Sequence, residues 1–279
     1  MKRISQQIIS CLFFALLGFQ IKIYTLNLNI ESIVFFRSLF AGLILFSIII
    51  CKKKISYFNV SKFNKVFLLR TIFGAVAMYF GYSSLLHISL SQATTLGFTK
   101  VFFTVLLSWI FFSEKINYSK FALIFLGFFG VYLISEPGFL IEPTGFYYIM
   151  ISSMAVSLGI ITVIYLGKKE ETLKILFFNS FLSTIVFGLL FYKEIDFNFF
   201  IHKVEYLVLT VTAILGQYFN TESYRNEKSA PIVLVSYSRI IFAFFIGLLF
   251  LGEKLSIQSV FGITIIALTT ILISLEKKS

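Results

Sequence analysis

The sequence predicts an all-α integral membrane protein with ten transmembrane helices arranged as two inverted five-helix repeats. Of its 279 residues, 58% are hydrophobic and only 13% are charged, whereas a soluble domain carries roughly 25% charged residues. Apolar runs of about 20 residues, long enough to cross a hydrocarbon core, recur along the chain. These runs are apolar on every side, which argues against the alternating pattern of a membrane β-barrel.

Breakers separate the ten predicted spans. Pro137 and Pro143 divide the fifth span from the sixth, and Pro231 opens the ninth, where its missing N–H costs nothing. The N-terminal run begins like a signal peptide but lacks a cleavage site of small residues, so we expect a retained first helix. The spans cover residues 7–26, 32–51, 66–87, 91–112, 117–135, 145–166, 173–192, 205–224, 231–251 and 256–275.

Basic residues in the loops set the orientation of such a protein. With ten spans, 17 of the 24 Lys and Arg residues fall on one side of the membrane, four on the other and three inside spans. Both termini lie on the basic side. We therefore expect a multi-pass protein of the cytoplasmic (inner) membrane with both termini in the cytoplasm.

The chain repeats itself at an offset of 139 residues. The segment 98–114, FTKVFFTVLLSWIFFSE, corresponds to 237–253, YSRIIFAFFIGLLFLGE, and pairs Lys100 with Arg239. Each half holds five spans, so the second half enters the membrane upside down relative to the first. We place the first repeat at 1–138 and the second at 139–279. Inverted repeats are typical of secondary transporters, whose binding sites lie near the membrane midplane between the repeats.

Motifs in both halves resemble the EamA-type carriers of the drug/metabolite transporter superfamily. The first half has LRTIFGAVAMYFGYSSLLHISLSQATTLGFTK (69–100) and GFFGVYLIS (127–135), and the second has YRNEKSAPIVLVSYSR (224–239). The resemblance covers essentially the whole chain. Within the superfamily, the FFR, LR and FTK patterns are most similar to the subgroup that includes S-adenosylmethionine carriers.

This resemblance implies ten helices in two inverted bundles and alternating access to a central cavity. It also implies small organic substrates such as amino acids, nucleotide-like metabolites or cofactors. The family often has a proline in spans four and nine, near the positions of Val101 and Ile240. This chain has none there, so the resemblance does not extend to a proline hinge.

Lys100 and Arg239 are the leading candidates for substrate binding. They lie about eight or nine residues into their spans, some 12–14 Å deep at 1.5 Å per residue. A charge at that depth is costly in lipid. We expect the pair to bind a carboxylate or phosphate. The structural alternative is that each tethers helix-end carbonyls or snorkels to an interface.

Further polar residues are candidates at the same site. Arg37 lies about five residues into its span, so substrate binding and anchoring at the outer face are both open. Gln217 and Asn220 make span eight polar. Glu222 in the same span could balance Arg239 or titrate during transport, or it could cap the cytoplasmic end of the helix.

Three tyrosines complete the predicted site. Tyr79 and Tyr218 are equivalent in the repeat and lie mid-span, where each hydroxyl needs a partner. We expect both to line the cavity, and Tyr237 is a further candidate. Glu114 and Glu253 end their spans at opposite faces, and we expect structural roles for them.

We therefore expect a secondary transporter that moves a small anionic or zwitterionic organic metabolite by alternating access. The substrate would be amino-acid-, nucleotide- or cofactor-like, for example S-adenosylmethionine. The alternatives are a channel, or a non-transporting membrane scaffold or intramembrane enzyme.

The expected partners are a small-molecule substrate and the lipid bilayer, with the chain as a monomer or homodimer. HExxH, GxSxG and P-loop motifs are missing, so we expect no enzyme and no catalytic residues. Cys11 and Cys51 suggest no metal-ligand pattern, and we expect neither a metal nor a cofactor. No basic patch lies outside the loops, which argues against nucleic acid as a partner.

Overall fold

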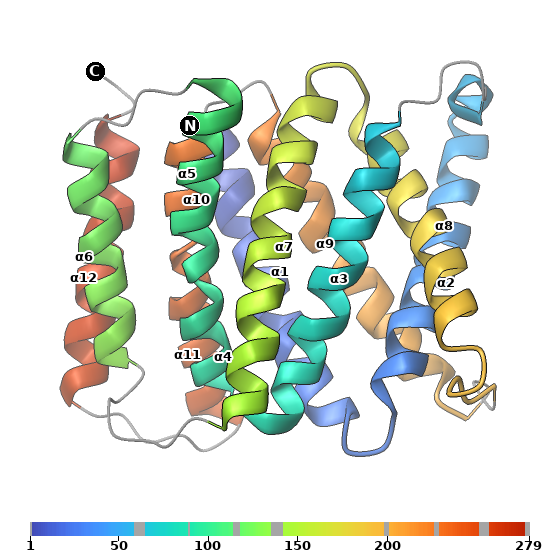
Figure 1. Cartoon of the computed structure of the whole chain (residues 1–279), viewed down its shortest axis with the longest axis horizontal. Coiled ribbons are helices and arrows are strands. Elements are labelled where there is room, and N and C mark those ends of the chain that lie inside the picture. The colour runs from blue at the N-terminus through green and yellow to red at the C-terminus, as the bar shows by residue number, and fades with distance from the viewer. Residues whose placement is uncertain are drawn as a thin grey trace.

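The protein forms a layer of helices that stand side by side, with both chain ends at the same end of the layer (Figure 1). The computed structural model describes residues 2–58, 65–88, 90–113, 118–134, 142–197, 201–225, 229–250 and 257–276. Within these ranges all regular structure is helical. The predicted all-α membrane class agrees with this architecture.

Each half contributes one set of helices. The first half has α1 (Lys2–Tyr24), α2 (Ile30–Cys51), the short 3₁₀ helix η1 (Ile55–Phe58), α3 (Val66–His87), α4 (Leu90–Gly97), α5 (Thr99–Phe112) and α6 (Tyr118–Ile134). The second half has α7 (Pro143–Gly167), α8 (Thr172–Leu190), α9 (Lys203–Tyr224), α10 (Ser229–Val235), α11 (Ser238–Phe250) and α12 (Ile257–Glu276).

Helices from the two halves pack in matching pairs. α3 packs on α7, and α9, the counterpart of α3, packs on α1, the counterpart of α7. α6 pairs with α12 at one edge of the layer, and α2 pairs with α8 at the other (Figure 1). The packing therefore follows the two-fold relation that the sequence repeat predicts.

Seven helical segments in the described ranges are long and apolar enough to cross a membrane. They are Arg3–Tyr24, Ile30–Cys51, Val66–His87, Gln92–Phe112, Pro143–Gly167, Thr172–Leu190 and Pro231–Phe250. Shorter apolar stretches occur in α6 (Phe121–Leu133) and α12 (Val260–Thr269). α9 does not belong to the seven, and its sequence is interrupted by polar residues such as Gln217 and Asn220. The count of ten crossings stays a prediction.

Spans four and nine differ from the continuous helices predicted over 91–112 and 231–251. The first is divided at Phe98 into α4 and α5, and the second is divided at Ser236 and Tyr237 into α10 and α11. Phe98 and Tyr237 are the residues paired by the repeat offset of 139. Both repeats are therefore interrupted at the same place.

Local hydrogen bonding explains the breaks without proline. The amide of Val101 donates to the carbonyl of Phe98 at 2.8 Å, a three-residue spacing that tightens the helix into a 3₁₀ turn. The hydroxyl of Thr99 donates to the carbonyl of Leu96 at 2.8 Å, and that of Ser238 to Val235 at 2.9 Å. Hydroxyls that bond the backbone in this way compete with regular helix bonds.

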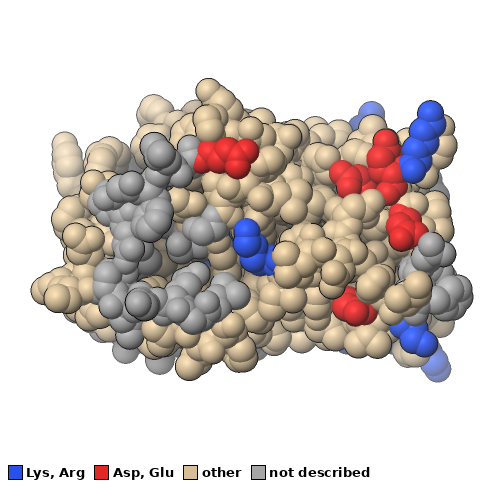
Figure 2. Space-filling view, turned by 90° about the horizontal axis from the view of Figure 1, so that it is seen from below, with Lys and Arg blue, Asp and Glu red and all other residues tan. Residues whose placement is uncertain are grey.

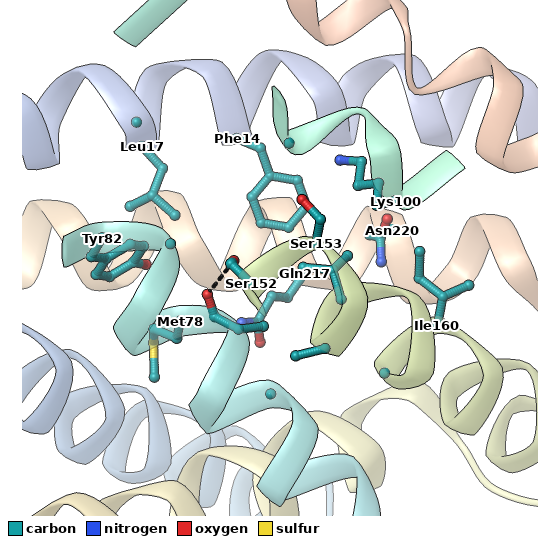
Figure 3. A pocket seen from close by; sticks show the side chains of 18 of the residues that line it. Phe14, Leu17, Met78, Tyr82, Lys100, Ser152, Ser153, Ile160, Gln217 and Asn220 are labelled. Atoms are coloured by element: carbon teal, nitrogen blue, oxygen red, sulfur yellow. Dashed lines mark hydrogen bonds between the residues drawn. The ribbon is translucent and has the colours of Figure 1, made fainter. Parts of the chain in front are cut away.

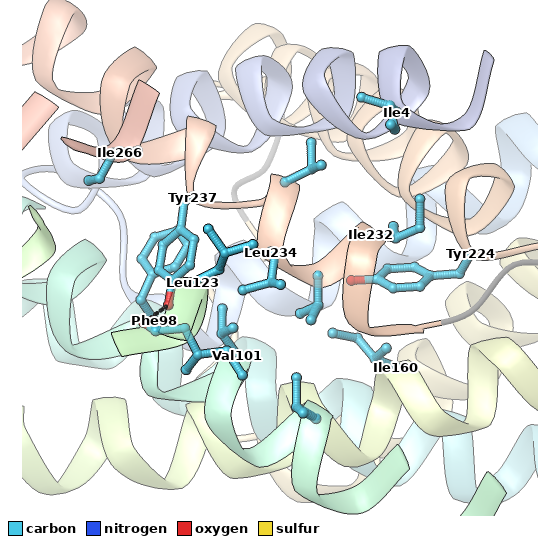
Figure 4. Packing of buried hydrophobic residues seen from close by; sticks show 14 of the residues in the cluster. Ile4, Phe98, Val101, Leu123, Ile160, Tyr224, Ile232, Leu234, Tyr237 and Ile266 are labelled. Atoms are coloured by element: carbon cyan, nitrogen blue, oxygen red, sulfur yellow. Dashed lines mark hydrogen bonds between the residues drawn. The ribbon is translucent and has the colours of Figure 1, made fainter. Parts of the chain in front are cut away.

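The two breaks meet in the largest hydrophobic core. The rings of Phe98 and Tyr237 stack with their centroids 5.2 Å apart and an interplanar angle of 20°. The Tyr237 hydroxyl donates to the carbonyl of Ile124 in α6 at 3.2 Å (Figure 4). Gly127, one turn further along α6, leaves room for the Tyr237 ring. This core therefore fixes both broken helices against α6.

Small residues allow α7 to approach α3 and α5 closely. The Ser152 hydroxyl donates to the carbonyl of Ala77 at 2.7 Å, and it lies where a side chain at Gly81 would be. The Ser157 hydroxyl donates to the carbonyl of Lys100 at 3.0 Å. Lys100 is therefore held through its backbone as well as by its helix. The predicted helix-end residues Glu114 and Glu253 lie outside the described residues.

Candidate functional site

A cavity of about 260 Å³ lies where the two halves meet. Its wall is formed by α1, α2, α3, α7, α8 and α9 and by the broken helices around Gly97 and Ser236. Figure 3 shows side chains from these elements converging on the opening between them. Such a position between repeats is where secondary transporters bind their substrates.

The cavity wall carries positive charge. No Asp or Glu occurs among the described lining residues. Four basic residues line the cavity: Arg37, Arg70, Lys100 and Arg239. Within the described part of the chain, none of the four belongs to an ion pair. A cavity with walls of low dielectric and one sign of charge concentrates ligands of the opposite sign. The wall is therefore suited to an anion.

The breaks position Lys100 and Arg239 next to each other. Each is the second residue of the helix that follows a break, α5 and α11 respectively. The Lys100 ammonium lies 4.8 Å from the centre of the Phe98 ring, and the Arg239 guanidinium lies 5.7 Å from that of Phe14. The two cations are close enough to repel each other. The N-terminal ends of both helices add positive potential.

Arg37 lies in the cavity wall, away from the outer end of α2. Arg37 is 6% exposed, and its guanidinium lies 5.8 Å from the centre of the Tyr82 ring. Its Nη1 donates to the sulfur of Met78 in α3. Thioether sulfur is a weak acceptor, so this bond holds the Arg37 guanidinium only weakly.

Arg70 is a cavity residue that was not among the predicted site residues and was counted with the basic residues of the cytoplasmic side. It belongs to α3, and its guanidinium extends along that helix to Gly74. It also passes close to Gly159 in α7. The signal that could have identified it is the Arg70–Gly74 spacing of one helical turn, since a glycine there makes room for a long side chain.

The other predicted polar residues divide into two groups. Gln217 and Asn220 of α9 line the cavity, whereas Tyr79 and Tyr237 do not. The Tyr79 hydroxyl donates to Glu31 at 3.1 Å, near the end of the layer away from the termini. Tyr237 is fully buried in the core described above.

Tyr218 lies outside the cavity wall as well. It is 37% exposed and packs edge-on against Phe219 at a centroid distance of 5.6 Å. The tyrosines that line the cavity are Tyr82 of α3 and Tyr224 of α9. Their positions follow from the rotation of each helix, which the repeat alignment does not specify.

Glu222 ties three helices together at the end of the layer that carries the termini. It accepts a hydrogen bond from Arg3 of α1 at 2.8 Å and another from the hydroxyl of Thr172 at the start of α8. Arg225 lies 3.6 Å away at the end of α9. These contacts match the helix-end role considered for Glu222, and Glu222 is not part of the cavity wall.

Further polar residues of the cavity wall were not among the predicted ones, and three of them lie close to its basic residues. Gln7 and Cys11 of α1 lie in the wall near Lys100 and Arg239, and Cys11 is 2% exposed. Asn179 of α8 lies near Arg70. Near the front of each half the repeat offset shifts to 142, which aligns Phe35-Phe36-Arg37 with Phe177-Phe178-Asn179. This correspondence of Asn179 with Arg37 could have identified it. Among the described residues, no cluster of His, Cys, Asp or Glu is arranged to hold a metal ion.

Comparison with known families decides the class of this membrane protein. The model of the EamA-like transporter family matches residues 2–136 and matches again over residues 143–275. The chain belongs to the EamA-like transporter family. As an EamA-like protein it is a multi-pass membrane transporter and not an enzyme, and its two halves are EamA repeats. The predicted family is confirmed.

Relatives of this EamA-like chain carry transporter names. An uncharacterized transporter of Helicobacter pylori (strain ATCC 700392 / 26695) is 31% identical over 258 residues, covering 87% of this chain and 84% of the relative. The pseudopaline exporter CntI of Pseudomonas aeruginosa (strain UCBPP-PA14) is 23% identical over 268 residues, covering 95% and 93%. A protein crystal structure with 14% identity matches with a TM-score of 0.71, covering 96% of this chain and 93% of the other. That structural likeness shows the shared fold.

Proposed function

We propose that this EamA-like protein is a secondary carrier that moves a small anionic organic metabolite across the cytoplasmic (inner) membrane by alternating access. Lys100 and Arg239 bind the anionic group, and Gln217 and Asn220 donate further hydrogen bonds. Arg37 adds charge to the same wall. The observation that carries the proposal is the cavity between the repeats, which is lined by four cations and by no carboxylate of the described residues.

Cavity charge also bears on the kind of substrate. A zwitterion whose negative group faces these cations fits the wall, whereas a ligand with net positive charge is repelled by it. S-adenosylmethionine carries a sulfonium centre and is therefore a weaker candidate than amino-acid- or nucleotide-like anions. The pseudopaline exporter among the relatives supports export of a metabolite as one direction of transport.

The proposed topology has ten crossings, with the repeats divided between residues 138 and 139. The broken pairs α4–α5 and α10–α11 each count as one crossing, and α9 crosses because its polar residues face the cavity. Figure 2 shows the end away from the termini, where acidic side chains of the described surface are interspersed with basic ones. The proposal of cytoplasmic termini rests on the distribution of basic residues along the sequence, under the positive-inside rule.

Uptake into proteoliposomes tests this proposal. Labelled glutamate, AMP and S-adenosylmethionine serve as probes, and trans-stimulation by the unlabelled compound separates a carrier from a pore. We expect Lys100→Ala and Arg239→Ala each to lower uptake about tenfold or more, because each loses a charge-assisted hydrogen bond. Lys169→Ala is the matched control, since Lys169 is exposed and bonds Tyr165. Normal uptake by a folded Lys100→Ala or Arg239→Ala protein contradicts the proposed site.

A further inference from the structure

Arg70 and Asn179 have no role in the anion site formed by Lys100 and Arg239, yet both belong to the cavity wall. The Arg70 guanidinium and the Asn179 amide both lie next to Gly74, which has no side chain. A Cβ atom on Gly74 would lie 3.0 Å from Arg70 Nη1 and 3.0 Å from Asn179 Oδ1. A Cβ atom on Gly159 would lie 3.2 Å from the same Nη1. Two glycines thus leave room for one guanidinium between α3, α7 and α8.

Polar atoms at this place lack partners. The Nε atoms of Arg37 and Arg70 and the Oδ1 atom of Asn179 are buried and have no hydrogen-bond partner in the described part of the chain. Arg37 and Asn179 are 6% and 7% exposed. A buried donor without an acceptor is costly. The two arginine Nε–H groups therefore lack an acceptor, which an anionic ligand would supply, whereas Asn179 Oδ1 lacks a donor.

Charge at this place is also unbalanced. Arg37 and Arg70 are close enough to repel each other. Among the described residues, the Arg37 side chain donates to the weak Met78 sulfur, and no carboxylate pairs with either arginine. An anion between the two guanidinium groups would offset this repulsion and accept from both, because arginine suits bidentate recognition of carboxylate and phosphate.

Tyr82 separates this place from the first anion site. Its ring lies 5.8 Å from the Arg37 guanidinium, and its hydroxyl interacts electrostatically with both Arg37 and Arg239. Figure 3 shows Met78 and Tyr82 on one side of the cavity and Lys100 on the other. Lys100 and Arg239 each follow a helix break, whereas Arg70 belongs to α3 and Arg37 donates to Met78 of the same helix. We therefore treat the four cations as two pairs, Lys100 with Arg239 and Arg37 with Arg70.

We infer that Arg37, Arg70 and Asn179 form a second anion subsite, and that the substrate is a small organic dianion whose two carboxylate or phosphate groups each occupy one subsite. This inference rests on the proposed function and specifies its substrate class. The amide group of Asn179 supplies an additional donor to the second anionic group. Tyr82 lies against the skeleton that joins the two groups.

Ligand-induced thermal stabilisation of the purified, detergent-solubilised protein tests the inference. The probes are the dicarboxylates from malonate to adipate and, for each, the monocarboxylate of the same chain length, all at constant ionic strength. We expect one or more dicarboxylates to bind wild-type protein about tenfold tighter than the matched monocarboxylate, since a second charge-assisted contact is added.

Variants separate the two subsites. Arg70→Met is expected to remove the advantage of the dicarboxylate while changing monocarboxylate affinity less than about twofold, and Arg70→Lys to keep part of it, because the charge remains. Asn179→Asp, which places a carboxylate beside Arg70, is expected to act like Arg70→Met. Arg239→Met weakens both ligand types, and Lys169→Met weakens neither.

The outcomes distinguish the two proposals. Equal affinity for mono- and dicarboxylates in wild-type protein, or an unchanged ratio in both Arg70→Met and Asn179→Asp, overturns the second subsite and leaves the first intact. Binding of anions that is insensitive to Arg239→Met contradicts the first site instead. If Arg70→Met does not fold, the Asn179→Asp measurement decides, since this change keeps the side-chain volume nearly constant.

Discussion

Gly74 shows how much of the cavity depends on single missing side chains. Its Cα hydrogen faces the place where the Arg70 guanidinium and the Asn179 amide come together. A methyl group there would force one of the two polar ends to move. The position of Arg70 is therefore set by the absence of a side chain one turn along its own helix.

Gly74→Ala is expected to weaken dicarboxylate binding without altering any charge. The added Cβ would lie 3.0 Å from both polar atoms, which is closer than these contacts allow, so Arg70 leaves its position. Dicarboxylate affinity measured by thermal stabilisation should fall by about threefold or more, a loss of at least about 0.7 kcal/mol.

The matched control for this change is Gly42→Ala in α2. A Cβ atom there would meet its nearest neighbours, backbone atoms of Phe181, at 3.8 Å, which is an ordinary contact. Equal effects of the two substitutions would show that steric placement of Arg70 is unimportant for binding.

At the scale of the elements, one ion pair fastens the segment after α2 to the start of α8. Lys54 donates to Glu171, and both residues lie outside the helices that span the membrane. The hydrogen bond from Lys54 lowers the pKa of the Glu171 carboxyl from its usual value of 4.5. The Glu171 carboxylate in turn raises the pKa of Lys54 above 10.5.

A carboxyl whose pKa is lowered by folding stabilises the native state above its unfolded pKa, and the contribution is lost as the pH falls through the folded value. We therefore expect Glu171→Gln to lower the melting temperature slightly at pH 7, and the difference from wild type to disappear once the pH is well below 4.5. The pair is largely exposed, so the difference should also shrink in high salt. Melting curves across pH and salt check this. A difference that persists at low pH would contradict the pairing.

Sequence patterns predicted the helices well but not their interruptions. Phe98 is followed by Thr99 and Lys100, and Tyr237 lies between Ser236 and Ser238. Neither place has the proline that would signal a break in a helix. The cause lies in hydroxyls that bond the backbone locally, such as those of Thr99 and Ser238. Threonine and serine are common within membrane helices, and only the folded chain shows which of them compete with the helix.

The sequence predicted how deep the candidate site residues lie in the membrane, but it did not predict toward which neighbour each side chain points. The repeat gave the depth of Lys100 and Arg239, and the structure brings these two together. Equivalence in the repeat also paired Tyr79 with Tyr218, but it carries no information on helix rotation, which turns Tyr79 toward Glu31. Arg70 escaped notice because it lies near the start of span three, where a basic residue is expected at the membrane surface.

At the scale of the whole molecule, alternating access requires the cavity to open toward each side in turn. Cys11 is suited to report this, because it lines the cavity and is 2% exposed. Cys51 is exposed at the end of α2 and would label in any state. A Cys51→Ser protein therefore carries a single thiol in the wall, since the sequence contains two cysteines.

We expect a membrane-impermeant maleimide to label Cys11 in the Cys51→Ser protein from either side of the membrane. Labelling should be slow, and a bound anion that occupies the cavity should slow it further. Mass spectrometry of right-side-out and inside-out vesicles measures the rate from each side. The Cys11→Ser protein, which keeps Cys51, is the control. Reaction from one side alone would be incompatible with alternating exposure of this wall.

The two-fold packing of the helices is not matched by the charges they carry. Lys100 and Arg239 are mates in the repeat, whereas the mate of Arg37 is the neutral Asn179 and that of Arg70 is Leu209. With the proposed second subsite, the bound substrate would lie off the pseudo-axis, and we expect its inward- and outward-facing complexes to differ in free energy. The carrier is expected to show different half-saturation concentrations at its two faces. Detailed balance then requires compensating differences in the rates at which the carrier reorients. Transport would be faster in one direction at low substrate concentration, although the final substrate concentrations on the two sides would still be those of equilibrium.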